Sequence, residues 1–306
     1  VLIYSNFFFF FFSPHILNCN YNQLNIFIMK KVILSVAFML AAGATFAQNN
    51  DSNTLQLGNS NNSGENQKGS YQDADVRQQG NSNVSSVSQG INPSASSASN
   101  HNKADVKQIG NSNNAFVSQN NLYNEAYQVQ TGNSNQATIW QDQLTPVAGN
   151  GNDWAKQLQT GNNNKATIDQ GTSGNEMPTG APFNAEALGF VAAITVPFMP
   201  HGFNDALQTQ NGDFNIAYTS QGGELNDSKI TQNSTAVALS GANKASHYQY
   251  GKDNDALTTQ TGYGQLDNTL QIGNLNYSNV TQTGNNQSAM NVQKGNSNVN
   301  NVMQSN

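Results

Sequence analysis

Cysteine and charged residues are scarce in this chain, and each shortage excludes a class of protein. The single cysteine is Cys19, and of the 306 residues only 10% are charged and 36% are hydrophobic. One thiol cannot build a disulfide framework. A hydrophobic content this low argues against an ordinary globular core, and a charge content this low argues against ordinary disorder.

The first 47 residues differ from everything after them. Segment 29–47 opens with a methionine and two lysines, continues with the apolar run Val32–Ala44 and closes on a small-residue ending, which predicts a secretory signal peptide cleaved before Gln48. An apolar run this short cannot serve as a permanent membrane anchor. Segment 1–28 is most simply an upstream stretch translated by mistake, and the alternative is a genuine apolar extension of the leader.

Removal of this leader would leave an acidic chain without cysteine. Twelve Lys and Arg, less the two lysines of the leader, leave ten against eighteen Asp and Glu, which gives a formal net charge of −8. Such a chain is a poor partner for nucleic acid. Since no thiol remains, we expect neither disulfides nor a catalytic cysteine.

What the chain has in quantity is glutamine at a fixed interval of eleven residues. Nineteen glutamines keep this spacing in five runs. Asn stands six residues before the glutamine in fifteen units, Ala or Ser four residues before it in seventeen, and Val or Ile two residues before it in nine. The repeating unit is therefore N-x-[A/S]-x-[V/I]-x-Q, commonly followed by x-G-N-x.

The four specified positions are two residues apart, which is the period of a strand with alternate side chains on one face. Glycine two residues after the glutamine supplies the positive φ of a tight reversal. Two units close one coil, so we expect an all-β fold, a β-solenoid of about nine to ten two-strand coils built from 11-residue half-repeats and stacked at ~4.8 Å. The predicted turn glycines are Gly80, Gly110, Gly132, Gly161, Gly262, Gly273, Gly284 and Gly295.

Stacked coils would place each Asn above an Asn and each Gln above a Gln, where side-chain amides can form hydrogen-bonded ladders. Buried amides are costly unless they are paired, so this pattern makes sense only if every coil has a like neighbour. The residues predicted to form the ladders are Gln78, Asn83, Gln89, Gln108, Asn113, Gln119, Asn124, Gln130, Asn135, Gln141, Gln159, Asn164, Gln170, Gln210, Asn215, Gln221, Asn226, Gln232, Gln249, Asn254, Gln260, Gln271, Asn276, Gln282, Gln293, Asn298 and Gln304.

Insertions of eight, seven, twenty-nine and six residues interrupt the repeat, in that order, after Gln89, Gln141, Gln170 and Gln232. The longest insertion, 171–203, separates repeat segments 48–170 and 204–306. It contains EALGFVAAITVPFMP, a stretch as rich in apolar residues as an ordinary globular protein. This stretch either packs as a flap on the flank of the solenoid or forms an adhesive or partner-binding patch.

We expect this solenoid to have no terminal caps. Soluble solenoids normally need capping segments with a polar outer face, whereas here the first unit begins at Asn50 and the last ends at Gln304. Both terminal coils are then expected to expose unpaired backbone N–H and C=O groups together with the same pattern of Asn and Gln side chains. This arrangement favours end-to-end addition of further copies as cross-β amyloid.

The repeats resemble those of the curlin family, the subunits of bacterial curli amyloid. The family's repeat is similar to S-x5-Q-x4-N-x5-Q, and Gln130, Asn135 and Gln141 within QVQTGNSNQATIWQ reproduce its Q-x4-N-x5-Q part. The resemblance covers about 48–306 apart from the insertions. This chain departs from the family in having Asn where Ser is usual, in its larger number of units, in its insertions and in lacking a distinct export segment before the first repeat.

The resemblance implies a secreted structural protein that leaves by the general secretory route, crosses the outer membrane through a curli secretion channel and self-assembles into cell-surface fibres for adhesion and biofilm matrix. It implies that the partners are further copies of the chain and a nucleator or major curli subunit. Whether this chain is the bulk subunit or the nucleator stays open. The alternative function is a monomeric β-solenoid adhesin that binds through 171–203.

The ionisable residues offer little for catalysis. His247 falls on an inward register, as a packed substitute for Val rather than a ligand, and the Asp73–Asp75 pair falls on an outward register as solvated charge. By the same count Trp140 and Tyr248 face outward. We expect no enzymatic activity, no cofactor, no metal and no small-molecule substrate.

Overall fold

A computed structural model describes residues 47–90, 100–141, 151–171 and 202–306. Residues 48–306 form one compact unit. The predicted upstream segment 1–28, the predicted signal peptide 29–47 except for its last residue, and residues 172–201 of the long insertion lie outside the described residues. Within the described ranges no helix has the length and apolar content needed to cross a bilayer.

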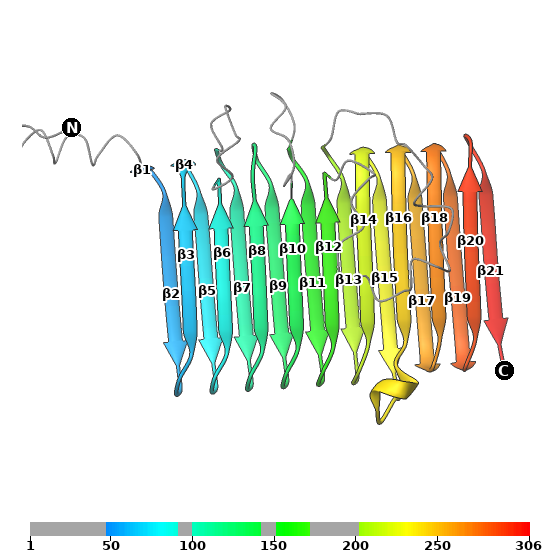
Figure 1. Cartoon of the computed structure of the whole chain (residues 1–306), viewed down its shortest axis with the longest axis horizontal. Helices are drawn as coiled ribbons and strands as arrows, with labels where there is room; N and C mark the ends of the chain where they lie inside the picture. Colours follow the sequence, from blue (N-terminus) through cyan, green and yellow to red (C-terminus); the bar gives the residue numbers. More distant parts are fainter. Residues whose placement is uncertain (1–46, 91–99, 142–150, 172–201) are drawn as a thin grey trace, which may run out of the picture. The chain divides into compact units, whose positions relative to one another are not determined.

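Strands alternate along the chain between two parallel sheets (Figure 1). The ten-stranded sheet contains, in spatial order, β2 (Asp51–Leu57), β5 (Asp73–Gln79), β7 (Lys103–Ile109), β9 (Glu125–Thr131), β11 (Trp154–Thr160), β13 (Asp205–Asn211), β15 (Asp227–Ser234), β17 (Asp255–Tyr263), β19 (Tyr277–Asn285) and β21 (Val299–Ser305). The nine-stranded sheet contains β3 (Asn62–Gln67), β6 (Val84–Gln89), β8 (Asn114–Gln119), β10 (Gln136–Gln141), β12 (Lys165–Gln170), β14 (Ile216–Glu224), β16 (Lys244–Lys252), β18 (Leu266–Asn274) and β20 (Ser288–Lys294).

Three short elements complete the described structure. Strands β1 (Ala47–Gln48) and β4 (Gly69–Ser70) pair as a two-stranded sheet, and the 3-10 helix η2 (Leu239–Gly241) lies between β15 and β16. The helix falls within the insertion after Gln232. This insertion is therefore accommodated at a turn and leaves the register of the next strand intact.

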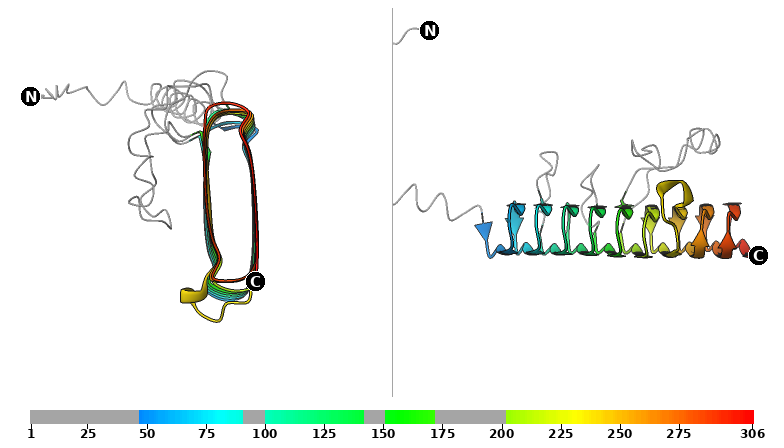
Figure 2. Two further views of the ribbon diagram at one scale, coloured as in Figure 1. Left: turned by 90° about the vertical axis from the view of Figure 1, so that its right-hand side faces the viewer. Right: turned by 90° about the horizontal axis from the view of Figure 1, so that it is seen from below.

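The stacked all-β architecture expected from the repeat is confirmed. Each of the nineteen predicted units forms one strand of the two large sheets, and neighbours within a sheet are two units apart. In β9, for example, Gln130 is in register with Gln108 on β7 and with Gln159 on β11. Seen end on, successive coils superimpose as a flattened two-walled loop (Figure 2).

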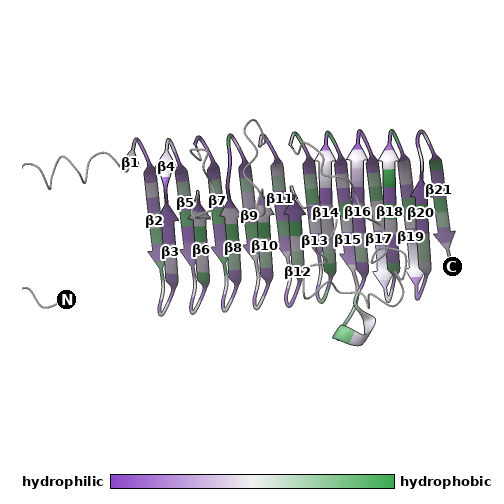
Figure 3. Ribbon diagram, turned by 45° about the horizontal axis from the view of Figure 1, so that its top comes forward, coloured by the Kyte–Doolittle hydropathy of each residue, from purple (hydrophilic) through white to green (hydrophobic). Residues whose placement is uncertain are grey.

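Alternation decides which side chains are buried. In β8, Ala115, Val117 and Gln119 point inward and are 0–1% exposed, whereas Asn114 is exposed and Phe116 is half-buried. Small and β-branched side chains fit between two sheets that lie close together, so the apolar core is a narrow band of Ala, Val and Ile. Figure 3 shows hydrophobic positions as short bands within strands that are otherwise hydrophilic.

One part of the outward face is buried as well. Tyr248 lies on the outward register, as the alternation requires, but it is 1% exposed. Its ring packs 5.3 Å from that of Tyr218, and both belong to a cluster with Tyr250 and Leu270. The register predicts the direction of a side chain but not how much of it remains exposed to solvent.

The turn glycines are required by close packing between coils. Gly132 has φ +119°, and a Cβ added there would lie 2.0 Å from the carbonyl oxygen of Gly161 in the next coil. Gly110 faces the same obstacle, because its added Cβ would lie 1.9 Å from the oxygen of Gly132. A side chain at these corners would therefore push adjacent coils apart.

Substitution Gly132→Ala should lower the free energy of unfolding by about 2–4 kcal/mol, because both the positive φ and the carbonyl contact penalise the methyl group. The midpoint of denaturant unfolding measures this loss. Gly64 is the matched control, since its φ is not positive and nothing lies within 4 Å of an added Cβ. Equal losses for Gly64→Ala and Gly132→Ala would contradict the packing argument.

Candidate functional site

The glutamines form a continuous ladder inside each sheet. Gln130 Nε2 donates to Oε1 of Gln159 in the next coil (2.9 Å). Gln130 Oε1 accepts a hydrogen bond from Nε2 of Gln108 in the preceding coil (2.9 Å). Gln130 Nε2 also donates to the backbone oxygen of Asn114 on the opposite sheet (3.0 Å). Each glutamine therefore joins neighbouring coils along the stack and also ties the two sheets to each other.

The asparagines form a second pair of ladders, one at each corner where a strand begins. Asn113 Nδ2 donates to Asn83 Oδ1 in the preceding coil (3.1 Å) and to the carbonyl oxygen of the turn residue Gly132 (2.8 Å). The backbone N–H of Asn113 also donates to Asn83 Oδ1 (3.1 Å). These side chains thus satisfy polar groups that the turns would otherwise leave buried and unpaired.

The two kinds of ladder have opposite polarity. Glutamine amides donate toward the C-terminal end of the stack, as from Gln78 to Gln108 (2.8 Å). Asparagine amides donate toward the N-terminal end, as from Asn135 to Asn113 (3.1 Å). The two ends of the stack therefore differ in which ladder has an acceptor and which has a donor without a partner in the same row.

The structure places the predicted ladder residues together in these rows. All of them are buried except Asn298 and Gln304, which belong to the outermost strand β21 and its preceding corner and are half-buried. The predicted turn glycines all have positive φ.

Two further rows were not predicted. Gln128, Gln157 and Gln208 replace Val or Ile and form a short interior ladder with amide contacts of 3.0 and 3.1 Å. A second row lies in the exposed turns, where the backbone N–H of Asn81 donates to Asn111 Oδ1 (3.0 Å), and the pattern continues along the stack. The sequence contains a signal for each row. The interior row has glutamine at the position usually held by Val or Ile, and the turn row has Asn directly after the turn glycine.

One corner of the solenoid carries large side chains at positive φ. Tyr71, His101 and Tyr123 have φ of 57°, 59° and 57°, and their rings stack with centroids 4.6 and 4.8 Å apart. The equivalent position at the opposite corner is often Ser or Asn, as at Ser82 and Ser112. Ring stacking offsets part of the conformational strain at this corner.

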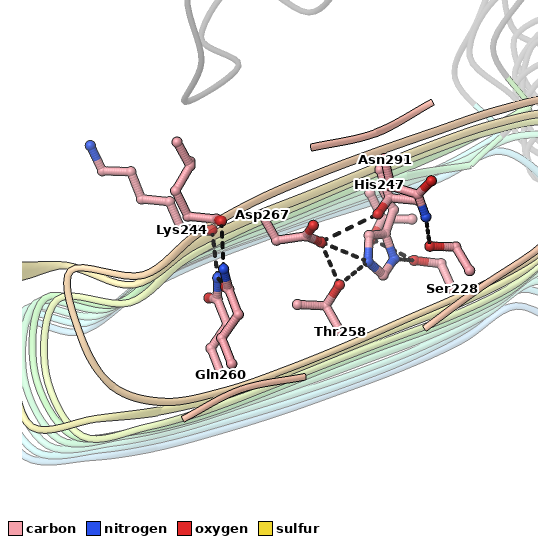
Figure 4. Close-up of polar contacts among 12 residues, drawn as sticks. Ser228, Lys244, His247, Thr258, Gln260, Asp267 and Asn291 are labelled. Carbon is pink, nitrogen blue, oxygen red and sulfur yellow. Dashed lines mark hydrogen bonds and ion pairs between the residues drawn. The ribbon is translucent and has the colours of Figure 1, made fainter. Parts of the chain in front are cut away.

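The described part of the interior contains an ionisable cluster around His247 (Figure 4). His247 Nδ1 contacts Ser228 Oγ (2.8 Å), and its Nε2 contacts Thr258 Oγ1 (2.7 Å) and lies 3.8 Å from Asp267 Oδ2. The Thr258 hydroxyl donates to Asp267 Oδ2 (2.5 Å). Asp267 was not predicted, although it occupies the Ala/Ser position of its unit, between Ala245 and Ala289 in register.

Burial decides the charge states in this cluster. Both side chains are fully buried, and this burial lowers the pKa of His247 to about 3 and raises the pKa of Asp267 to about 7. Hydrogen bonds from Thr258 and Thr269 oppose the shift of the Asp267 pKa without cancelling it. At mildly acidic pH both groups are therefore uncharged.

Three carboxylates stack on the outward face. Asp205, Asp227 and Asp255 are in register on β13, β15 and β17. Partial burial, and then repulsion from Asp227, raises the pKa of Asp255 to about 6. The described residues contain no group of three or more His, Cys, Asp or Glu that could hold a metal ion.

Comparison with known proteins gives no relatives: no family model, no curated protein and no solved structure matches this chain.

Replacement of a ladder residue by a charge should destabilise the fold. For Gln130→Lys we expect a loss of more than about 3 kcal/mol, because the ammonium would be buried among amides without a counter-ion. Thr131→Lys is the control, since Thr131 is the next residue of β9 and is exposed on the outer face. Denaturant titration of both variants tests the assignment, and similar losses would contradict it.

The ionisable cluster predicts an unusual pH dependence. Since Asp267 has a folded pKa of about 7 against an ordinary 3.8, the folded state retains a proton that the unfolded state releases, and its contribution to stability falls as pH rises from about 4 to about 7. Asp267→Asn removes this loss, so the stability of this variant relative to the parent should grow across that window, by about 2–4 kcal/mol, and then stay constant.

His247 acts in the opposite direction, because its folded pKa of about 3 lies below its ordinary 6.5. Its contribution to stability rises with pH between about 3 and 6.5, so the stability of His247→Val relative to the parent should decline across that range. Unfolding midpoints measured from pH 3 to pH 8 give both curves. Differences that do not vary with pH would show that the cluster does not carry buried ionisable groups.

Proposed function

We propose that this chain is a secreted structural protein that self-assembles, end to end, into extracellular cross-β fibres. The observation that carries the proposal is the continuity of the backbone and amide ladders up to the outermost strands of the stack. Within the described residues no strand pairs with the outer edge of β2 or β21. All seven residues of β2 are exposed.

The two ends of the stack are chemically complementary. At one end the Nε2 groups of Gln293 and Gln304 donate to backbone oxygens but have no glutamine acceptor among the described residues. At the other end Gln56 and Gln67 donate to the next coil, and their Oε1 atoms have no glutamine donor in that same part of the chain. Donors at one end and acceptors at the other favour head-to-tail addition of a second copy.

The chemical character of the interior also favours a structural role. Among the described residues the interior is filled mainly by amides, small residues and Val or Ile, and Ser, His and Asp meet there only in the fully buried cluster around His247, which substrate could not reach. The resemblance of the repeats to curlin repeats supports adhesion and biofilm matrix as the use of such fibres. It also supports a nucleator or major curli subunit as partner and an outer-membrane curli channel as the export route.

Incubation of the chain without its leader tests the proposal directly. We expect a lag, growth of fibres that bind amyloid dyes, removal of the lag by sonicated seeds, and a cross-β diffraction pattern with a meridional spacing of about 4.8 Å. Monomer that persists at micromolar concentration in the presence of seeds would overturn the proposal and favour the monomeric adhesin.

Gln304→Lys separates assembly from folding. Gln304 is half-buried in the isolated stack but would be enclosed once a copy adds to β21. We expect this variant to keep monomer stability within about 1 kcal/mol of the parent, while seeded elongation slows severely. Elongation at the parental rate would argue against growth through this end.

A further inference from the structure

Successive half-repeats of this solenoid are related by a half-turn about the stack axis. Consecutive large strands alternate between the two sheets, and both sheets use the same inward pattern. The contacts between sheets are also equivalent in both directions: Gln130 donates to the oxygen of Asn114 (3.0 Å), and Gln119 donates to that of Lys103 (2.9 Å), each sixteen residues back. One half-repeat is thus converted into the next by rotation through about half a turn and a rise of half a coil.

The stack of residues 48–306 contains an odd number of these half-repeats. Its first strand β2 and its last strand β21 both belong to the ten-stranded sheet. The next position along the stack beyond β21 lies in the other sheet, beside β20, and none of the described strands occupies it. An added copy must place its own β2 at that position if both sheets are to continue without a gap.

We propose that, in a fibre built from residues 48–306, neighbouring copies are rotated by about 180° relative to each other, so that the ten-stranded sheet of one copy continues as the nine-stranded sheet of the next. This inference rests on the proposed head-to-tail assembly. In this arrangement β2 of the added copy pairs with β20, and its β3 pairs with β21. Without rotation, β2 would pair with β21 alone, and β20 and β3 would face a gap one strand wide.

The side chains at the rotated junction are compatible in register. Alignment of Gln56 with Gln293 continues one glutamine ladder, and alignment of Gln67 with Gln304 continues the other. On the outer face the same register places Leu55 beside Val292, which are 50% and 51% exposed in the isolated stack. Rotation therefore completes two strand pairs and two amide ladders and also covers two apolar side chains.

Engineered disulfides distinguish the two arrangements. In-register residues on adjacent parallel strands are about 4.8 Å apart, within the Cα separation that a disulfide needs. Rotation brings Asn53 of one copy beside Met290 of the other, whereas stacking without rotation brings Asn53 beside Asn301. Within one chain β2 lies at the opposite end of the stack from β20 and β21, so each bond would report a contact between copies.

We expect oxidised fibres of the N53C/M290C variant to convert most of the monomer band on a denaturing gel into a ladder of covalent oligomers, and those of N53C/N301C to remain monomeric. The reverse pattern in well-formed fibres would overturn the half-turn while leaving the proposed assembly intact. Absence of seedable fibres from both variants and from the parent chain would instead overturn the assembly proposal, and the half-turn with it.

Removal of one half-repeat provides the matched control. A chain that stops at Lys294 lacks β21, so its last strand lies in the nine-stranded sheet and an added copy needs no rotation. Cross-linking should then shift to the N53C/N279C pair, because β2 of the added copy would pair with β19, and it should be lost from N53C/M290C.

Image reconstruction of the parent fibre should give a rotation near 180° per copy with a rise of about 46 Å. A rotation near zero in the parent would contradict the inference.

Discussion

The structure depends on pairing amides that have been taken out of water. An unpaired buried amide is costly, whereas a glutamine here donates to a backbone oxygen of the opposite sheet and exchanges hydrogen bonds with glutamines above and below. The same group that would destabilise an isolated coil therefore stabilises a stack. This requirement explains why the chain repeats one pattern many times, since only an identical neighbour offers a donor and an acceptor at the right height.

The other sequence features follow from that stacking. Alanine and serine between the amide rows keep the sheets close enough for glutamine to reach the opposite backbone, and glycine at the corners allows carbonyl groups of adjacent coils to approach where a Cβ would clash. Insertions enter at turns, where they leave the register of the following strand unchanged. The His247–Asp267 cluster departs from this pattern of amides, and its two groups avoid the cost of burial by remaining neutral at mildly acidic pH.

The proposed end-to-end assembly would use the same kinds of contact that hold one chain together. The end strands have backbone groups with no partner strand among the described residues, and they carry glutamines of the same ladders as the interior coils. Because the glutamine and asparagine ladders donate in opposite directions, the two ends of the stack differ. A fibre of such units would consequently be polar. The geometry of each junction would be set by how many half-repeats a copy contributes, which is a property that composition alone does not show.

The sequence by itself determined the strand period, the inward and outward faces, the eleven-residue unit and the positions of the ladder amides, because each depends on local alternation repeated at fixed spacing. Only the tertiary structure decided that His247 and Asp267 meet on the adjacent strands β16 and β18 of one sheet and share Thr258 from the opposite sheet, since these residues belong to three different units. It also decided that Tyr248 is buried although its register points outward, and that large rings stack at positive φ at one corner. These features depend on contacts between coils, and such contacts are not encoded in the period of a single strand.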